Sequence, residues 1–271
     1  MQHPSLFSLI FRAFSSLAAI VTLGGVTTVV EEYNVLRLLA GDGTAGYADG
    51  DATTSTMFKH PYTVVADSRG VVYIADGHNH AVRKFDPSTN EVTTIAGGNG
   101  QGISGDHGMA TSAKLSKPWG LSFGSNESIL YVGMDRSVRK IDLLAGVITT
   151  FAGGNSYAYD GDGGLAIDAK FKIPRALFYR NDNLYVSDLN ANVVRKINSS
   201  NIVVTVAGNG TRGFYGDDGP ATLAMINMPR AIAVDAYENI YIADTNNNRI
   251  RKVDNLTGVI TTFAGSLHSF K

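Results

Sequence analysis

One pattern recurs four times along this chain at a constant interval of 56 residues. An Arg-Lys pair marks each copy, and a short apolar segment ending in Ala-Gly follows it. Self-similarity at such a period is typical of propellers and solenoids, in which each unit buries its faces against its neighbours. The repeat therefore constrains the fold more than the chain length does. The four arginines are Arg83, Arg139, Arg195 and Arg251.

Each unit contains four short apolar segments separated by turns. In the last unit they span residues 231–235, 240–244, 249–254 and 259–264. They are rich in β-branched and aromatic residues and are bounded by Gly, Asn and Asp, which is typical of short antiparallel strands in a meander. No segment of the repeats keeps a 3.6-residue period, so we expect few helices. The predicted class is all-β, with an additional fourth-strand copy at residues 35–40.

A known family matches this pattern. The segments Tyr241–Asp244, Asn248–Val253 and Ile260–Gly265 closely resemble NHL repeats, and residues 208–222 resemble the long-loop form of that repeat. The resemblance covers roughly residues 35–265. It implies a β-propeller, usually six-bladed, that most often serves as a binding platform. The four four-stranded blades predicted here lie at about 62–96, 119–152, 175–207 and 230–264.

Four blades are few for a closed ring of this type. We therefore expect an open arc or an incomplete propeller. An open arc would leave sheet faces and edges exposed. The chain continues only to residue 271 after the last fourth strand, which favours a truncated product or an odd gene boundary. Self-association that completes a ring is the other expectation.

Residues 1–34 do not match the repeat. The stretch 13–30 carries no charge, Arg12 precedes it, and two glutamates follow it. Its length is at the lower limit for a membrane helix, and the charge order suits insertion with the N-terminus in the cytoplasm. The alternative is β-strand material, since residues 26–30 are strand formers. We divide the chain into an apolar segment, 1–34, as a candidate signal or anchor, and a propeller, 35–271. The expected location is extracellular or membrane-anchored, with the tether in residues 13–30.

Composition removes several classes of function. The formal net charge is −1, so no general attraction to nucleic acid is expected. The chain has no cysteine, which excludes disulfides, thiolate catalysis and Cys-based zinc sites. No nucleophile elbow and no phosphate loop occur. We predict no cofactor, and a protein or glycan ligand as partner.

The recurring arginines are interpreted as structural, because one falls in each blade whereas a nucleic-acid surface needs clustered charge. We expect each to form a fork with the aspartate that ends the second strand of its own blade. The predicted pairs are Arg83 with Asp76, Arg195 with Asp188, Arg251 with Asp244, and Arg139 with Asp135, where the turn is two residues shorter.

A second aspartate recurs in the crossover before each blade. Glycines surround it. One interpretation is a calcium site, because closely spaced aspartates supply oxygen ligands. No loop has the complete ligand pattern of an EF-hand. The favoured interpretation is therefore that the aspartate accepts hydrogen bonds from backbone amides of the turn. These residues are Asp49, Asp106, Asp162 and Asp217.

The histidines are considered as ligands of a catalytic metal. Three imidazoles can make a catalytic site, but catalytic metals in propellers lie on the axis and take ligands from several blades. Three of the four candidates fall in one blade, so no metal site is predicted. The four are His60, His78, His80 and His107.

Residues that do not recur are the better binding candidates. In a meander the second-to-third-strand turns and the long crossovers share one edge of each sheet, so we expect both on one face. Aromatics beside amides and an arginine are typical of recognition surfaces. The alternative is that the aromatics fold inward and fill their own loops. The predicted binding residues are Tyr47, His78, His80, Arg136, Tyr157, Tyr159, Asn190, Phe214, Tyr215 and Asn247.

The predicted function is a non-enzymatic binding or scaffold module that recognises a protein or glycan through this long-loop face. The alternative is a metal-dependent lyase or lactone hydrolase, since some six-bladed relatives of the resembled fold are such enzymes. The alternative predicts tightly bound zinc or calcium.

Overall fold

The computed structural model describes residues 20–23, 26–29, 38–154 and 156–265, and the chain forms two compact units, 1–40 and 41–271. In the first unit, β1 (Ile20–Leu23) and β2 (Val26–Val29) pair as an antiparallel hairpin. The rest of the predicted anchor, and most of the predicted strand at 35–40, lie outside the described residues. Within the described ranges, no helix has both the length and the apolar character needed to span a bilayer.

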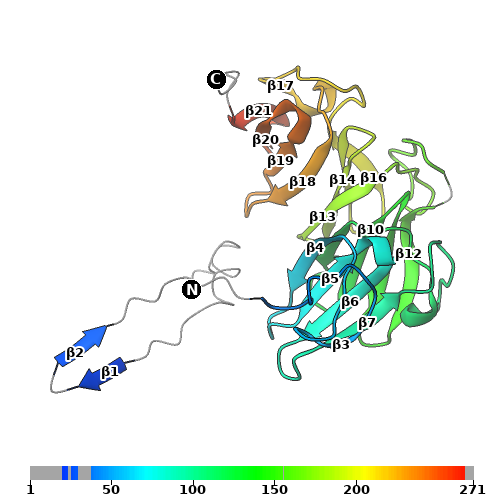
Figure 1. The fold of residues 1–271 in the computed structure, drawn as a ribbon. Helices are drawn as coiled ribbons and strands as arrows, with labels where there is room; N and C mark the ends of the chain where they lie inside the picture. The colour runs from blue at the N-terminus through cyan, green and yellow to red at the C-terminus, as the bar shows by residue number, and fades with distance from the viewer. Residues whose placement is uncertain (1–19, 24–25, 30–37, 155, 266–271) are drawn as a thin grey trace. The chain divides into compact units, whose positions relative to one another are not determined.

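The second unit confirms the all-β class and the repeated meander. Its strands form four antiparallel sheets that follow one another along the chain (Figure 1). Each sheet is one blade, and its four main strands pair in chain order. Blade 1 has β4 (Pro61–Ala66), β5 (Val72–Asp76), β6 (Ala81–Asp86) and β7 (Glu91–Gly97). Blade 2 has β9 (Gly120–Phe123), β10 (Ile129–Met134), β11 (Ser137–Asp142) and β12 (Val147–Gly153).

Blades 3 and 4 repeat the same order. Blade 3 has β13 (Pro174–Arg180), β14 (Asn183–Asp188), β15 (Val193–Ile197) and β16 (Val203–Ala207). Blade 4 has β18 (Pro229–Val234), β19 (Ile240–Asp244), β20 (Arg249–Val253) and β21 (Val259–Ala264). In the described residues of this unit, helix is limited to four single 3₁₀ turns: η1 (Gly77–Asn79), η2 (Ala110–Ser112), η3 (Ala221–Leu223) and η4 (Thr245–Asn247).

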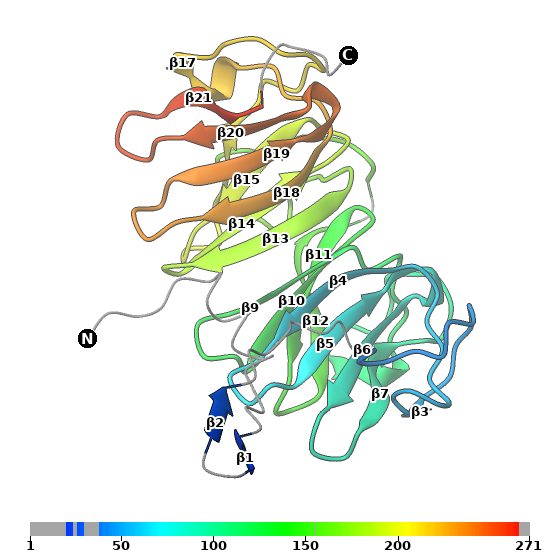
Figure 2. The same ribbon diagram turned by 60° about the vertical axis from the view of Figure 1, so that its left-hand side comes forward.

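The first strand of each blade contacts the first strand of the next, so β4, β9, β13 and β18 are the inner strands (Figure 2). Apolar side chains fill the seam between successive sheets. Tyr131 of β10, for example, stacks on Tyr179 of β13 with ring centroids 5.8 Å apart. Burying one such side chain contributes roughly 1.5–3 kcal/mol, so each seam stabilises the two blades that it joins.

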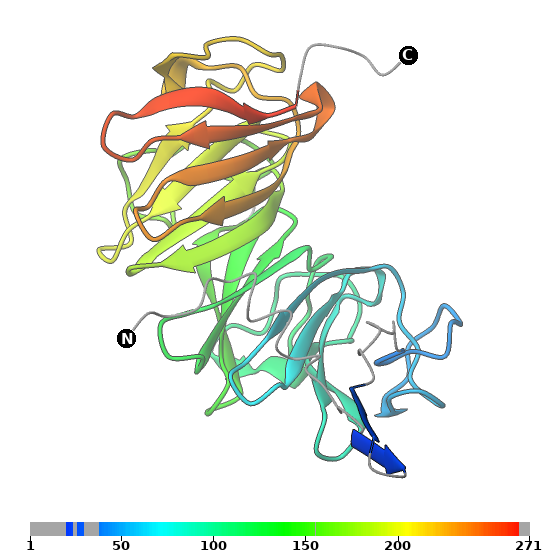
Figure 3. The ribbon, with the colours of Figure 1, turned by 90° about the vertical axis from the view of Figure 1, so that its left-hand side faces the viewer.

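The last blade has no described neighbour on its far side. Tyr241 and Phe263 hold the positions that Tyr131 and Phe151 hold in blade 2, and their ring centroids lie 5.1 Å apart. Phe263 is 62% exposed, whereas Phe151 packs against the core between blades 2 and 3. The sheets therefore form an open arc of four blades and do not close into a ring (Figure 3).

Each long crossover adds a short fifth strand to the outer edge of the blade that it precedes. β3 (Gly50–Asp51) pairs with β7, β8 (Gly108–Met109) with β12, and β17 (Gly219–Pro220) with β21. In blade 3 a single bridge between Leu165 and Ile202 takes this place. The crossover then returns to the inner strand, so it spans its own blade from edge to edge.

A buried arginine fastens each crossover to its blade. Arg195 is fully buried, and its Nε and Nη2 donate to Asp162 Oδ1 at 3.0 and 2.6 Å. Its Nη1 donates to the Lys170 carbonyl at 2.8 Å and its Nη2 to the Asp160 carbonyl at 3.0 Å. Asp162 Oδ2 accepts the Thr205 amide of β16 at 3.1 Å. One carboxylate thus joins the crossover to two strands, and we call this arrangement the arginine latch.

The latch carboxylate is the crossover aspartate in all four blades. Its oxygen lies 2.6–2.7 Å from the arginine in the pairs Arg83–Asp49, Arg139–Asp106, Arg195–Asp162 and Arg251–Asp217. The predicted partner was the strand-end aspartate. Arg83 does reach Asp76 at 2.9 Å, and Arg251 lies 3.8 Å from Asp244.

The predicted strand-end pairing is wrong for Arg139 and Arg195. Asp188 accepts the amides of Lys172 and Ile173 at 2.9 and 2.8 Å, and burial raises its pKa. Asp135 accepts the indole N–H of a neighbouring tryptophan at 2.9 Å. The strand-end carboxylates are therefore used to hold the returning end of the crossover.

Asp51 at the end of β3 gives the first crossover a dependence on pH. Hydrogen bonds from the Thr54 hydroxyl and the Thr53 amide lower its pKa from 3.8 to about 2. A lowered pKa in the folded state means that this stabilisation is present above pH ~4 and is lost as the pH falls toward ~2. We expect Asp51→Asn to flatten the loss of stability in that window, measured as urea midpoints by circular dichroism. An unchanged slope would contradict the assignment.

Candidate functional site

The second-to-third-strand turns lie against the crossovers, as the meander predicts. Asn79 Nδ2 donates to the Gly46 carbonyl at 2.6 Å, and Asn247 Nδ2 donates to the Gly213 carbonyl at 2.7 Å. Each of these side-chain amides also donates to the strand-end aspartate of its own blade, Asp76 or Asp244, at 2.8 Å. We define the long-loop face as the crossovers 41–60, 98–119, 154–173 and 208–228, with the turns 77–80, 135–136, 189–192 and 245–248.

Three of the predicted binding aromatics are engaged within their own blades. The guanidinium carbons of Arg83, Arg195 and Arg251 lie 5.0, 5.3 and 5.1 Å from the ring centres of Tyr47, Tyr159 and Phe214, respectively. The hydroxyls of Tyr47 and Tyr159 are 2.9 and 2.6 Å from threonines of the fourth strand. One face of each ring covers a buried cation, which favours the inward alternative for that face, while Tyr47 and Phe214 remain 48% and 37% exposed. Blade 2 has Ile103 at this position.

The other two predicted aromatics, in the described residues, do not cover a latch arginine. Tyr157 is 49% exposed and Tyr215 is 69% exposed. Asn190 Nδ2 donates to the Tyr157 hydroxyl at 2.5 Å, and the Arg136 guanidinium lies 5.9 Å from the Tyr157 ring centre. The structure therefore brings Arg136, Tyr157 and Asn190 together across the boundary of blades 2 and 3, while Tyr215 stands alone on blade 4.

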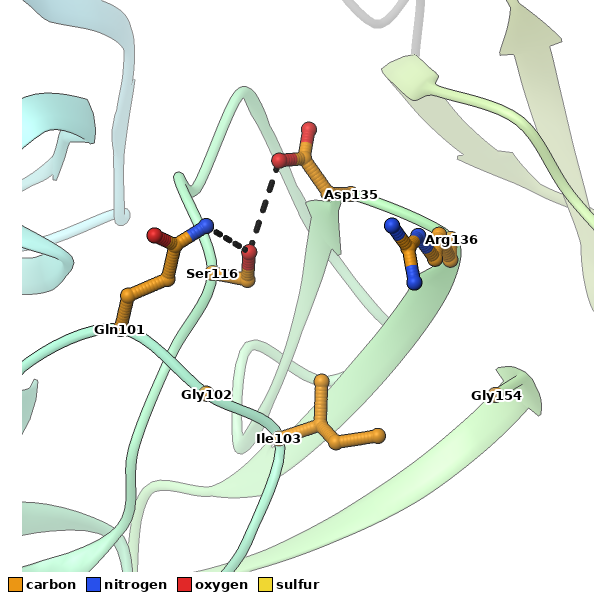
Figure 4. A pocket seen from close by; sticks show the side chains of 7 residues that line it. All are labelled: Gln101, Gly102, Ile103, Ser116, Asp135, Arg136 and Gly154. Carbon is orange, nitrogen blue, oxygen red and sulfur yellow. Dashed lines mark hydrogen bonds between the residues drawn. The ribbon is translucent and has the colours of Figure 1, made fainter. Parts of the chain in front are cut away.

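A hollow of about 250 Å³ lies beside Arg136. Figure 4 shows Gln101, Ser116 and Asp135 joined by hydrogen bonds along one side, with Arg136 and Ile103 completing the rim. Gln101 Nε2 donates to Ser116 Oγ at 3.1 Å, and Ser116 Oγ lies 3.4 Å from Asp135 Oδ2. Asp135 thus offers acceptor capacity to a ligand that enters the hollow.

A second cluster lies at the start of the inner strands. The residue after the recurring proline is Tyr62, Trp119, Arg175 or Arg230 in blades 1 to 4. The Tyr62 and Trp119 ring centroids are 4.2 Å apart. The Arg175 guanidinium lies 4.9 Å from the Trp119 ring centre and 5.4 Å from that of Tyr62.

Two histidines extend this cluster on blade 1. His78 Nε2 lies 3.0 Å from the Tyr62 hydroxyl, and the His78 ring is 4.2 Å from the His60 ring. Burial, followed by the charges of His60, Lys117 and Lys59, lowers the pKa of His78. We call this set the inner-edge ladder: His60, His78, Tyr62, Trp119, Arg175 and Arg230.

Four members of the ladder were not predicted, because the binding candidates were sought in the crossovers and turns and not at the start of the inner strands. The available signal was variation at one aligned position beside a proline that all four repeats share. That position is Tyr, Trp, Arg and Arg in blades 1 to 4. A repeat position that keeps its backbone role but changes its side chain presents something different in each blade.

The predicted His80 belongs to the frame of this face. Its Nδ1 accepts the Lys117 amide at 3.1 Å, and burial lowers its pKa. The imidazole is therefore held neutral against the returning crossover. Across the described residues, no three His, Asp or Glu side chains group as metal ligands, His60, His78, His80 and His107 included.

Comparison with known proteins gives one family and several relatives. The model of the NHL repeat matches residues 58–85. Protein SUPPRESSOR OF QUENCHING 1, chloroplastic, from Arabidopsis thaliana is 28% identical over 234 residues, which cover 81% of this chain and 22% of that protein. NHL repeat-containing protein 2 from Homo sapiens is 28% identical over 269 residues, which cover 88% of this chain and 37% of that protein. The chain thus spans well under half the length of either relative.

A solved structure supports the fold. A chain of the nidogen/laminin complex matches with a TM-score of 0.52 at 12% sequence identity, over 78% of this chain and 67% of that chain. At this identity the likeness concerns the fold alone.

Proposed function

The chain is an NHL-repeat protein, and on that premise we propose that it is a non-enzymatic scaffold module that binds a protein partner through its long-loop face. The observation that carries the proposal is the contrast between frame and surface. The latch repeats in all four blades, whereas the exposed side chains of the long-loop face differ from blade to blade. A repeated frame with a varied surface is the usual arrangement of a recognition platform.

The site between blades 2 and 3 is the proposed centre of contact. It combines an exposed tyrosine, an exposed arginine and a hollow of about 250 Å³ within one boundary. Tyrosine and arginine are the side chains most enriched at the energetic centres of protein interfaces. The match to a chain of the nidogen/laminin complex agrees with this proposal, because that fold is there seen in a complex with a second protein.

The test measures how well a variant with the proposed contact residues replaced by alanine captures the protein partner. We expect Arg136→Ala, Tyr157→Ala and Tyr215→Ala, combined, to reduce capture of the main partner from a native extract by at least about tenfold, since each central contact is worth ~1–2 kcal/mol. Capture is measured by quantitative mass spectrometry on immobilised full-length chain. Thermal unfolding of the triple variant should match that of the unmodified chain, because these side chains stand on the surface.

A matched control lies on the opposite edge of the sheets. Leu144, Tyr237 and Leu256 are 88%, 81% and 93% exposed, and they occupy first-to-second and third-to-fourth-strand turns. Their combined replacement by alanine removes comparable apolar surface and should leave capture unchanged. Equal loss in both triple variants, or no loss in either, would refute binding through the long-loop face.

A further inference from the structure

Positive charge gathers around the inner-edge ladder on a chain that is nearly neutral. The formal net charge is −1, yet Lys59, Lys117, Arg175 and Arg230 all lie where crossovers return to the inner strands. Arg230 also acts on its neighbour: burial lowers the pKa of Arg175, and the charge of Arg230 lowers it further. Two cations that raise each other's energy are stabilised by an anion placed between them.

The Arg175 guanidinium is preorganised. It lies over both Tyr62 and Trp119, at 5.4 and 4.9 Å from their ring centres, which restricts where the guanidinium can move. Within the described part of the chain, neither Arg175 nor Arg230 forms an ion pair or donates a side-chain hydrogen bond. Their N–H groups are therefore free for a ligand, in contrast to the four latch arginines.

The geometry favours a carboxylate over a nucleic acid. A guanidinium presents paired N–H groups that match the two oxygens of a carboxylate. Nucleobases need a free aromatic face for stacking, whereas Tyr62 and Trp119 lie against each other with ring centroids 4.2 Å apart and the Arg175 guanidinium carbon lies 4.9 Å from the Trp119 ring centre. The ladder contributes two arginines, Arg175 and Arg230, on adjacent inner strands, rather than a long stripe of positive charge.

We propose that Arg175 and Arg230 bind side-chain carboxylates of a short acidic segment in the protein partner, with Trp119 and Tyr62 as the platform beneath the guanidinium. This assignment rests on the proposed function and names the chemistry of the bound segment. Asp135, which accepts the Trp119 indole N–H at 2.9 Å, links the ladder to the hollow and can accept a backbone amide of the same segment.

The chain contains its own reporter for this test. Trp119 is the single tryptophan, so its emission reports on the ladder alone. The full chain is titrated with acetylated, amidated hexaglutamate, and separately with hexaglutamine, inorganic phosphate and an oligo-dT of equal length. We expect a saturable change of Trp119 emission with hexaglutamate, weakened by added salt, and a weaker or absent response to the other three probes.

The variants distinguish the contribution of the positive charge from that of the bidentate hydrogen bonding. Arg175→Gln is expected to weaken hexaglutamate binding about tenfold or more, since a charge-assisted bidentate pair is lost. Arg230→Gln should weaken it at least about threefold, and Arg175→Lys should fall between, because it keeps charge without the fork. The control is Arg69→Gln: the Arg69 side chain is 75% exposed, pairs with Asp67, and lies on the opposite edge, so binding should not change. Arg230 is exposed, so its variant tests the proposal even if Arg175→Gln lowers thermal stability.

Three outcomes overturn the proposal: an equal response to hexaglutamine, tighter binding of phosphate or oligo-dT than of hexaglutamate, or unchanged binding in both arginine variants. These outcomes are distinct from failure of the scaffold function. If the ladder variants lose nothing while the Arg136, Tyr157 and Tyr215 variant loses partner capture, the long-loop face still binds its partner, but by other chemistry.

Discussion

Replacing Arg195 with methionine is expected to lower the free energy of unfolding by about 3 kcal/mol. The guanidinium is fully buried and makes four hydrogen bonds, two to Asp162 and two to the Lys170 and Asp160 carbonyls. Methionine fills a similar volume but removes all four bonds. Asp162 keeps the Thr205 amide and the Asp160 carbonyl keeps the Lys170 amide, whereas the Lys170 carbonyl loses its donor. Hydrogen bonds to a charged group contribute roughly 1.5–3 kcal/mol each, of which the apolar replacement recovers a part. For a unit of this size the melting temperature should fall by about 6–12 °C, measured by calorimetry.

Arg139→Met is the matched control in blade 2. The latch carboxylates Asp106 and Asp162 are equally exposed, at 36% and 37%, so loss of the ion pair costs about the same in both blades. Arg139 makes only two hydrogen bonds, one of them at 3.3 Å, and its buried Nε has no partner. Burial accordingly lowers the pKa of Arg139. We expect this variant to lose about 1 kcal/mol or less. Equal losses in the two variants would contradict the role given to the carbonyl bonds.

Gly133→Val is expected to have the second large effect, by forcing blades 2 and 3 apart. A Cβ at Gly133 would lie 2.3 Å from the Pro174 carbonyl oxygen of β13, closer than carbon and oxygen can approach. The valine must therefore displace the inner strand of blade 3, and overpacking of this kind costs about 1–3 kcal/mol. We expect a loss at the upper end of that range, measured by urea unfolding, because the obstructing atom is backbone.

The control for the seam is Ala243→Val. Ala243 holds the position of Gly133 in blade 4, opposite Ala231 as Gly133 lies opposite Gly120. Within the described chain no blade follows on that side, and Ala243 is partly exposed whereas Ala75 and Ser187, the equivalents in blades 1 and 3, are fully buried. Valine favours a strand more than alanine does, so stability should not fall. A large loss in this variant would mean that something covers the free face of blade 4.

Local sequence was sufficient for the strands and for the repeated frame, because each strand is written in residues that form it. The latch partner was not predictable in the same way. Two aspartates recur in every unit at plausible distances from the arginine, and the choice between them depends on how the crossover runs along the outer edge of its blade. That path is set by β3, β8 and β17, each only two residues long. Strands so short leave no periodic signal.

The ladder escaped prediction for a different reason. Tyr62 and Trp119 lie 57 residues apart in sequence, and Arg175 follows another 56 residues later, so their contact exists only after three blades have packed. Aligned repeat positions on successive inner strands become spatial neighbours. Reading such positions across the repeats, rather than along one of them, would have pointed to the cluster.

The outer strand that each crossover contributes also bears on how such a chain can be inherited and folded. In blade 1 the farthest contacts of the latch, from Asp49 to Thr94, span 45 residues, which is less than one repeat. The latch contacts of a unit thus lie within one repeat of the sequence, from the start of its crossover to the end of its fourth strand. Such contacts close a shorter loop than contacts between blades do, so their closure costs less entropy. Duplication or loss of one whole segment then changes the number of blades without breaking any latch, which allows the length of the arc to vary while its surface residues diverge.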